Sequence, residues 1–345
     1  MKEIKMFVPG RLCLIGGVSD LVSPYLSQNL DLVPGRAIAC TIDKGIYSKV
    51  KKCNKLKYKF NDINFEIDIS LESLTEEANS NTFFSYICGT VLCMLKKYNN
   101  LSGLDITIEK MDLPLKKGLS SSAAICLTIV KAYNELYDLN LTNNEIVMLA
   151  YNGEHLAGSK CGLLDQNTII NNNCSTLTFY EDKVESKGVN LKNNLYVLIV
   201  DLNSSKDTKK IMNAFNKALP FAKDDNDKKL QDIIGKKNVA LVEKATFALE
   251  EGDIKLFGKC LSNAQKLYDA AQEACTEYKA PTLHLLLKDK IIKNNSYGGK
   301  SVGSGGDGSL LLICENEEKQ IILQKHIKEK YNMDSIPFCI KGAKN

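Results

Sequence analysis

The chain has 345 residues, of which 44% are hydrophobic and 25% are charged, and this balance is ordinary for a globular protein of about two domains. Its net charge of +4 is small and its basic residues are scattered, which argues against a nucleic-acid-binding protein, where a basic stripe is expected. The N-terminal segment MKEIKMFVPG has no apolar core of signal-peptide length, and no apolar run approaches the roughly 20 residues of a membrane span. We therefore expect a cytoplasmic protein without a membrane partner.

Cysteine and histidine usage argues against a disulfide framework and against a zinc site. The chain has 12 cysteines and 3 histidines, and no cysteine pair has the C-x-x-C spacing. Several cysteines, such as Cys88, Cys126 and Cys314, lie inside apolar runs. We expect them to be buried thiols in a reducing compartment.

The N-terminal segment holds an arginine among apolar residues. Residues 3–15 suggest a short strand interrupted at Pro9 and Gly10, then a buried strand that ends at a glycine pair. Arg11 lies in the apolar part, and a buried guanidinium must meet an anion. That anion belongs either to a functional site or to a structural salt bridge.

Residues up to 202 combine strands with helices. Alternating apolar and polar residues predict antiparallel strands with one solvated face. Thr142 and Glu145 have the spacing of a capping box, which opens a helix that carries Glu154 near its end. The remaining predicted elements here are strands at 37–50, 64–70, 104–109, 174–180 and 195–201, and helices at 82–96 and 122–136.

The rest of the chain is mostly helical in pattern. Asp253 is placed to cap a helix, and the charged stretch 223–229 suggests a connection between helices. The predicted elements are helices within 208–275 and at 280–288 and 316–332, a glycine-rich segment at 296–308, and strands at 309–314 and 335–341. Since most strands precede residue 202, we predict two domains, residues 1–202 and 203–345.

The stretch LPLKKGLSSSAA, residues 113–124, has the pattern of an anion-binding helix start. A strand end leads into a turn at Gly118, then three serines and a helix. The first N–H groups of a helix have no intrahelical partner and carry partial positive charge, so a polyphosphate fits such a site. Lys116 lies just before it. The motif is neither a Walker A loop nor G-x-G-x-x-G, and an ordinary helix capped by serine is the alternative.

Three stretches in order resemble the signatures of the GHMP kinases. Residues 114–124 resemble the second signature, residues 9–16 the first, and residues 300–308 the glycine-rich third, although Asp307 departs from its pattern. The resemblance implies phosphoryl transfer from ATP. The residues it assigns to ATP are Lys116, Gly118, Leu119, Ser120, Ser121, Ser122, Ala123, Gly303 and Gly305.

The stretch CGLLDQ, residues 161–166, resembles the C-G-I-M-D-Q stretch of galactokinases, whose aspartate is the catalytic base. The resemblance implies that Asp165 is the base and Arg11 its electrostatic partner. It also implies that Ser122 and Glu154 hold Mg²⁺, a hard cation that prefers oxygen ligands. Without the resemblance, Asp165 would be a turn residue and Glu154 an exposed helix residue.

The resemblance further assigns Asp20, Gly17, Gly162 and Asp165 to the acceptor. Asp20 matches the sugar-binding aspartate of galactokinases, but their preceding Glu-His pair is absent here. The stretch GGVSD, residues 16–20, is closer to the G-G-G-T-D of heptose phosphate kinases. Galactose itself is therefore in doubt.

The resemblance implies an α+β fold with two domains, an N-terminal domain like ribosomal protein S5 domain 2 and a ferredoxin-like C-terminal domain. The expected function is an ATP- and Mg²⁺-dependent kinase acting on a sugar or sugar derivative, at the anomeric C1 hydroxyl. The alternatives are a heptose phosphate or mevalonate-type kinase and a galactokinase-like ligand sensor without turnover. The sequence does not predict the oligomeric state.

Overall fold

The structure, a computed structural model, describes residues 2–113, 118–159, 161–171, 173–181, 183–204, 208–276 and 279–342. Contacts divide the chain into two compact units. Unit 1 comprises Met1–Arg11 and Thr41–Asn172, and unit 2 comprises Leu12–Cys40 and Asn173–Asn345. Lys116, a predicted ATP contact, lies outside the described residues.

Unit 1 is built on a sheet in which β5 lies between β2 and β3. The strands are β1 (Glu3–Ile15), β2 (Gly35–Cys53), β3 (Lys55–Phe60), β4 (Ile63–Asp68) and β5 (Gly103–Met111). Strand β5 pairs antiparallel with the second half of β2 and parallel with β3, and β4 pairs antiparallel with β3. The alternating segments therefore form antiparallel strands as predicted.

Strand β1 is continuous, so the predicted interruption at Pro9 and Gly10 is wrong. Among the described strands, β1 pairs with β2 alone, and an edge strand tolerates proline because one side needs no N–H donor. Gly10 is required by packing. A Cβ there would lie 2.9 Å from the carbonyl oxygen of Leu119 and 2.4 Å from the side chain of Leu113.

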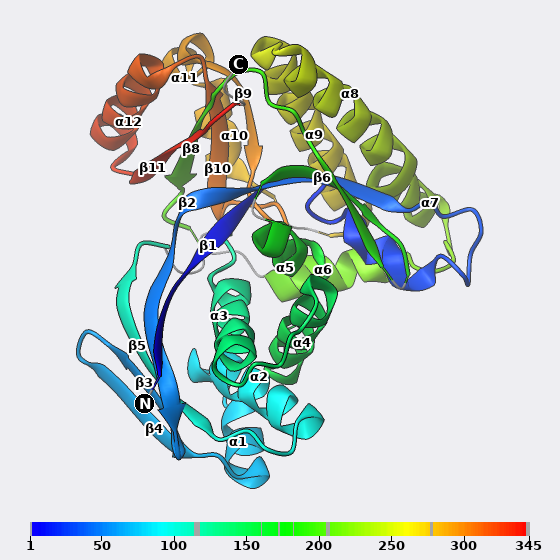
Figure 1. The fold of residues 1–345 in the computed structure, drawn as a ribbon. Coiled ribbons are helices and arrows are strands. Elements are labelled where there is room, and N and C mark those ends of the chain that lie inside the picture. The colour runs from blue at the N-terminus through cyan, green and yellow to red at the C-terminus, as the bar shows by residue number, and fades with distance from the viewer. Residues whose placement is uncertain are drawn as a thin grey trace. The chain divides into compact units, whose positions relative to one another are not determined.

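The helices of unit 1 pack together on one side of this sheet (Figure 1). They are α1 (Leu71–Ala78), α2 (Phe84–Lys97), α3 (Ser121–Leu136), α4 (Asn143–Leu156) and α5 (Leu164–Asn171). Helix α4 begins with the predicted capping box of Thr142 and Glu145. A Cβ on Gly153 would lie 2.6 Å from the Cα of Thr90 in α2, so this glycine permits the close approach that holds the end of α4.

Unit 2 contains a four-stranded antiparallel sheet in the order β11, β8, β10 and β9 (Figure 1). Its strands are β8 (Leu195–Asp201), β9 (Ser296–Ser301), β10 (Ser309–Cys314) and β11 (Ser335–Ile340). The first six residues of β2, Gly35–Cys40, also belong to this unit, where they pair with β6 (Cys174–Phe179), and β6 pairs with β7 (Val184–Gly188).

Four helices of unit 2 contact this sheet, namely α9 (Ile254–Cys275), α10 (Pro281–Lys288), α11 (Lys290–Asn295) and α12 (Glu317–Tyr331). The other helical segments described in this unit are η1 (Ser19–Tyr25), α6 (Thr208–Asn216), α7 (Asp225–Asp232), the π-helix η2 (Ile233–Lys237) and α8 (Asn238–Glu251). Leu283, Leu312 and Leu323 belong to one buried cluster that joins α10, β10 and α12.

One prediction of local structure in unit 2 is wrong. The charged stretch 223–229 is not a connection, because Asp224 caps α7 by accepting a hydrogen bond from the N–H of Asp227. The glycine-rich segment 296–308 begins with strand β9. The predicted cap at Asp253 is confirmed, since its carboxylate accepts from the N–H of Leu256 at 2.8 Å.

The compact units cut the chain after residues 11, 40 and 172, whereas the distribution of predicted strands along the sequence places a domain boundary near residue 202. That boundary stays a prediction. Within the described ranges, no helix combines the length and the apolar character that crossing a membrane requires.

Asp289 holds a buried polar network in unit 2. Its side chain is 3% exposed and accepts from Lys330 Nζ at 2.7 Å, Tyr331 Oη at 2.8 Å and the N–H of Ile292 at 3.0 Å. His326 Nε2 lies 3.2 Å from the same carboxylate. Burial acts to raise the pKa of Asp289, but the hydrogen bonds outweigh it and lower the pKa below its usual range.

Replacing Asp289 by Ala is therefore expected to destabilise the protein by about 3 kcal/mol at neutral pH, since the ammonium and hydroxyl partners lose a buried acceptor. Because the folded-state pKa is lowered, this stabilisation is present above about pH 4 and is lost as pH falls further. Urea unfolding of the wild type and the variant at pH 7 and pH 3 measures the difference. An equal difference at both pH values would contradict the charge-based account.

Candidate active site

The turn before α3 does not follow the ordinary serine-capped pattern. Ser120 precedes the helix in the left-handed region, with φ of 59°, and Gly118 has φ of 79°. The side chain of Ser120 makes no capping hydrogen bond to the helix. The alternative of an ordinary serine cap is therefore wrong for Ser120. Because the Ser120 hydroxyl does not bind the first N–H groups of α3, these groups can donate to another acceptor. A left-handed non-glycine residue at a site is strained backbone that the surroundings must hold.

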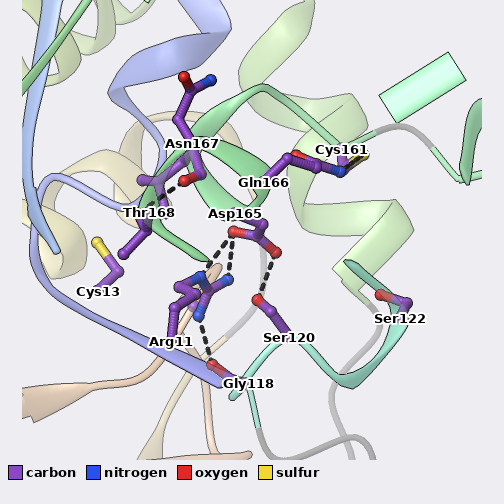
Figure 2. Close-up of polar contacts among 12 residues, drawn as sticks. Arg11, Cys13, Gly118, Ser120, Ser122, Cys161, Asp165, Gln166, Asn167 and Thr168 are labelled. Atoms are coloured by element: carbon purple, nitrogen blue, oxygen red, sulfur yellow. Dashed lines mark hydrogen bonds and ion pairs between the residues drawn. The ribbon is translucent and has the colours of Figure 1, made fainter. Parts of the chain in front are cut away.

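Ser120 instead donates to a carboxylate. Its Oγ lies 2.5 Å from Oδ2 of Asp165, which is in the first turn of α5. Arg11 of β1 approaches the other oxygen, with Nε 2.7 Å and Nη2 2.6 Å from Oδ1. Figure 2 shows Arg11 and Ser120 both pointing toward Asp165. The carboxylate thus has a charged partner on one oxygen and a hydroxyl on the other.

Arg11 also holds the turn itself. Its Nη1 donates to the carbonyl oxygen of Gly118 at 2.6 Å, as Figure 2 shows, and its backbone N–H donates to the carbonyl of Leu119 at 3.2 Å. Arg11 is 8% exposed. One buried guanidinium therefore joins the turn before α3 to Asp165, and the expectation that Arg11 meets an anion is confirmed.

A second carboxylate lies beside this group. Glu154 of α4 is 3% exposed, and its Oε1 accepts from Ser122 Oγ at 2.8 Å. Its Oε2 accepts from Gln166 Nε2 at 2.7 Å. Burial and the nearby charge of Asp165 raise the pKa of Glu154 to about 7, against the smaller opposing effects of its hydrogen bonds and of Arg11. The alternative of an exposed helix glutamate is excluded.

Ser122 and Glu154 fit a divalent cation. They offer a hydroxyl oxygen and a carboxylate oxygen, which are the ligand types that Mg²⁺ prefers, and Mg²⁺ usually takes only one or two carboxylates from a protein. A buried carboxylate with a raised pKa gains from a nearby cation. Over the part of the chain that the structure describes, no three His, Cys, Asp or Glu side chains gather as a larger metal-binding group.

Gln166 is a site residue that sequence reasoning missed. It is fully buried and donates to Glu154, and its Oε1 has no hydrogen-bond partner among the residues that the structure describes. The signal in the sequence was its position directly after Asp165, because consecutive residues of a helix point in different directions. Gln166 binds Glu154 and its neighbour Asp165 binds Arg11 and Ser120, so the short helix α5 connects the two carboxylates.

The remaining residues predicted to contact ATP or the acceptor lie at several separate places in the structure. Leu119 is 1% and Ala123 is 0% exposed, so their apolar side chains belong to the core. Ser121 opens α3, and Gly162 lies in the loop before α5. Gly17, Asp20, Gly303 and Gly305 belong to unit 2.

The departure from the third signature has a structural reason. Asp307 is 7% exposed, and its carboxylate accepts from the N–H groups of Thr282 at 3.0 Å and Leu283 at 2.8 Å. These groups open α10, whose Pro281 has no N–H to cap. Asp307 therefore holds the end of the glycine-rich segment against α10.

Comparison with known proteins agrees with this arrangement. Residues 85–172, which include Ser120, Ser122, Glu154 and Asp165, match the family model described as GHMP kinases N terminal domain. This segment of the chain is therefore similar to the N-terminal domain of GHMP kinases. The predicted family resemblance is thereby confirmed.

The similarity to known proteins extends over nearly the whole chain. A galactokinase of Pyrococcus furiosus is 24% identical over 370 residues, covering 99% of both chains. Galactokinase of Lactococcus lactis, solved with galactose, has a TM-score of 0.79 at 19% identity, covering 99% of this chain and 94% of the other. Mevalonate kinase of L. major, solved with R-mevalonate, has a TM-score of 0.74 at 17% identity, covering 99% and 97%. These structures confirm the predicted α+β GHMP kinase fold.

Proposed function

We propose that this protein is an ATP-dependent kinase that transfers the γ-phosphate of ATP to a hydroxyl of a sugar or sugar derivative. The observation that carries the proposal is the carboxylate of Asp165, held by Arg11 and Ser120 beside the turn that opens α3. A buried arginine and a left-handed serine are costly local features, and both converge on this one side chain. Such an arrangement has the geometry of a fixed base next to an anion-binding helix start.

The nucleotide part of the proposal rests on α3. Gly118 and the backbone N–H groups of residues 119–123 would hold the phosphates, since the hydroxyl of Ser120 is committed to Asp165. Ser122 and Glu154 would hold Mg²⁺, which when bound neutralises charge on the phosphates. Catalysis of this reaction is mostly positioning and electrostatic stabilisation, which suits a rigid set of hydrogen-bonded side chains.

The acceptor part of the proposal rests on Asp165. Its ionised carboxylate would accept the proton of the acceptor hydroxyl as the phosphoryl group arrives. Arg11 keeps the carboxylate oriented and, through Gly118, at a fixed place relative to the phosphate turn. Binding of the acceptor by Asp20, Gly17 and Gly162 stays part of the proposal.

The relatives named galactokinase favour a sugar acceptor. Transfer to the anomeric C1 hydroxyl stays part of the proposal, because the stretch CGLLDQ around Asp165 resembles that of galactokinases. The runner-up is a heptose phosphate or mevalonate-type kinase, which the stretch GGVSD and the mevalonate kinase fold keep open. A ligand sensor without turnover is disfavoured, because Arg11, Ser122, Glu154 and Asp165 are all present and mutually arranged.

The deciding experiment is ADP release with ATP and Mg²⁺ across a panel of hexoses, uronic acids, deoxy sugars, heptose phosphates and mevalonate. We expect one sugar to give turnover, and phosphorus NMR of its product to show a phosphate at C1. Turnover with mevalonate alone would replace the sugar proposal. ATP binding without turnover on any member would favour the sensor.

Replacing Ser122 by Ala is expected to raise the Mg²⁺ concentration needed for half-maximal activity by about tenfold, the effect of losing one ligand or its orienting bond. Ser121→Ala is the matched control, since it removes the neighbouring hydroxyl at the same helix start. Magnesium titrations of ADP release measure both. If the two variants respond alike, Ser122 has no special place at the metal.

A further inference from the structure

Tyr268 of α9 is a buried residue that touches the glycine-rich segment of unit 2. Its side chain is 6% exposed, and its hydroxyl donates to the carbonyl oxygen of Gly303 at 3.0 Å. The ammonium of Lys300, at the end of β9, lies 5.6 Å from the centre of the tyrosine ring. Gly303 has φ of 65°, so the carbonyl that the tyrosine holds belongs to a left-handed turn.

The same hydroxyl faces a second loop of unit 2, residues 16–20. A Cβ on Gly17 would lie 3.3 Å from Oη of Tyr268 and 3.4 Å from the carbonyl oxygen of Gly303. The absence of a side chain at Gly17 therefore lets this loop lie against the Tyr268–Gly303 contact. Burial, followed by the nearby Cys13 and Asp20, raises the pKa of Tyr268, so the hydroxyl stays protonated and remains a donor.

The next glycine of the segment also rests on α9. Gly305 has φ of 88°, and a Cβ there would lie 3.1 Å from Cδ1 of Tyr268 and 2.8 Å from Nε2 of Gln272. Gln272 is 4% exposed, and within the described ranges its Nε2 has no hydrogen-bond partner. One side of α9 thus supports Gly303 by a hydrogen bond and Gly305 by close packing.

We propose that Tyr268 is a positioning residue that sets the glycine-rich segment and couples it to the loop of residues 16–20. This inference rests on the proposed function, in which Gly17 and Asp20 contact the acceptor, and on the predicted assignment of Gly303 and Gly305 to ATP. Both loops meet the one hydroxyl of Tyr268. A shift of either loop then alters the contact that the other depends on, so acceptor and nucleotide binding are linked through this side chain.

The first test is Tyr268→Phe, which removes the hydroxyl and keeps the ring. Titration with a non-hydrolysable ATP analogue and Mg²⁺ is expected to give a Kd five- to tenfold higher than that of the wild type, as loss of one buried hydrogen bond produces. Tyr133→Phe is the matched control, because Tyr133 is also buried and donates to a backbone carbonyl, that of Ser102, at 3.1 Å. It lies near the end of α3, and we expect its Kd to be unchanged.

The second test is a double-mutant cycle with Gly17→Ala. In the wild-type background the added methyl group is expected to push on Oη of Tyr268 and to raise the Kd for the analogue severalfold. In the Tyr268→Phe background, where Oη is absent, it is expected to change the Kd less than twofold. Non-additivity of this kind supports the link between the two loops.

The outcomes separate the inference from the function on which it rests. Wild-type affinity in Tyr268→Phe, equal losses in the two Tyr→Phe variants, or additive effects in the cycle would overturn the role of Tyr268 and leave the kinase proposal standing. A wild-type protein that binds no nucleotide would overturn the kinase proposal, and the inference with it.

Discussion

Replacing Asp165 by Asn is expected to lower the rate of phosphoryl transfer by about 10³-fold, because an amide cannot accept the proton of the acceptor hydroxyl. The change keeps the size of the side chain. Arg11 can still donate to the amide oxygen, Ser120 can accept from the amide NH2, and Arg11 keeps its bond to the carbonyl of Gly118, so the turn before α3 is expected to persist. The affinity for ATP is therefore expected to stay within about twofold.

The measurement is ADP release with the acceptor found in the panel, together with nucleotide titration of the same preparation. Asp138→Asn is the matched control, since Asp138 is exposed in the same unit and its φ of 52° suits asparagine. Loss of nucleotide affinity in step with loss of turnover would make Asp165 a structural residue. Full activity in Asp165→Asn would remove it from catalysis.

Local pattern was enough for most elements, and the exceptions have identifiable causes. The charged stretch 223–229 looked like a connection because it lacks an apolar stripe, yet Asp224 and Asp227 have the spacing of a helix cap. Pro9 looked like a strand break because the sequence does not show that β1 lies at an edge. Each error came from the position of a residue. Asp224 lies where it caps a helix, and Pro9 lies in a strand at the edge of the sheet.

The sequence predicted which residues belong to the candidate site, but it predicted few of the contacts between them. Arg11 and Asp165 are 154 positions apart, and only the resemblance to a family predicted that they interact. The geometry of Ser120 was not predictable, because serine before a helix is ordinarily a cap and left-handed serine is uncommon. The role of Gln166 depends on the burial of Glu154, which sequence pattern alone does not give.

Glu154 is the residue for which activity and stability are expected to respond in opposite directions. In the absence of Mg²⁺ its buried carboxylate has a pKa of about 7, above the value of about 4.5 expected in the unfolded chain. A raised folded-state pKa means that stability is fully present below about pH 4.5 and falls as pH rises through about 7. Glutamine at this position cannot ionise and does not suffer this loss.

Replacing Glu154 by Gln is therefore expected to increase the free energy of unfolding at pH 8 in a chelator by roughly 2–3 kcal/mol, and to change it little at pH 4.5. Activity is expected to fall by about 10²-fold, since a neutral amide binds Mg²⁺ far more weakly than a carboxylate. Urea unfolding at the two pH values and magnesium titration of ADP release give the two readouts.

The control for this variant is Glu145→Gln on the same helix, where glutamine preserves the capping box and the side chain lies at the surface. Added Mg²⁺ is expected to stabilise the wild type and Glu145→Gln at pH 8 and to leave Glu154→Gln unchanged. A Glu154→Gln protein whose stability falls with pH as steeply as that of the wild type would show that another group titrates. A variant that Mg²⁺ still stabilises would place the cation elsewhere. The opposite responses of stability and activity are what a carboxylate buried for a cation produces, because its charge is a cost to the fold until the cation binds.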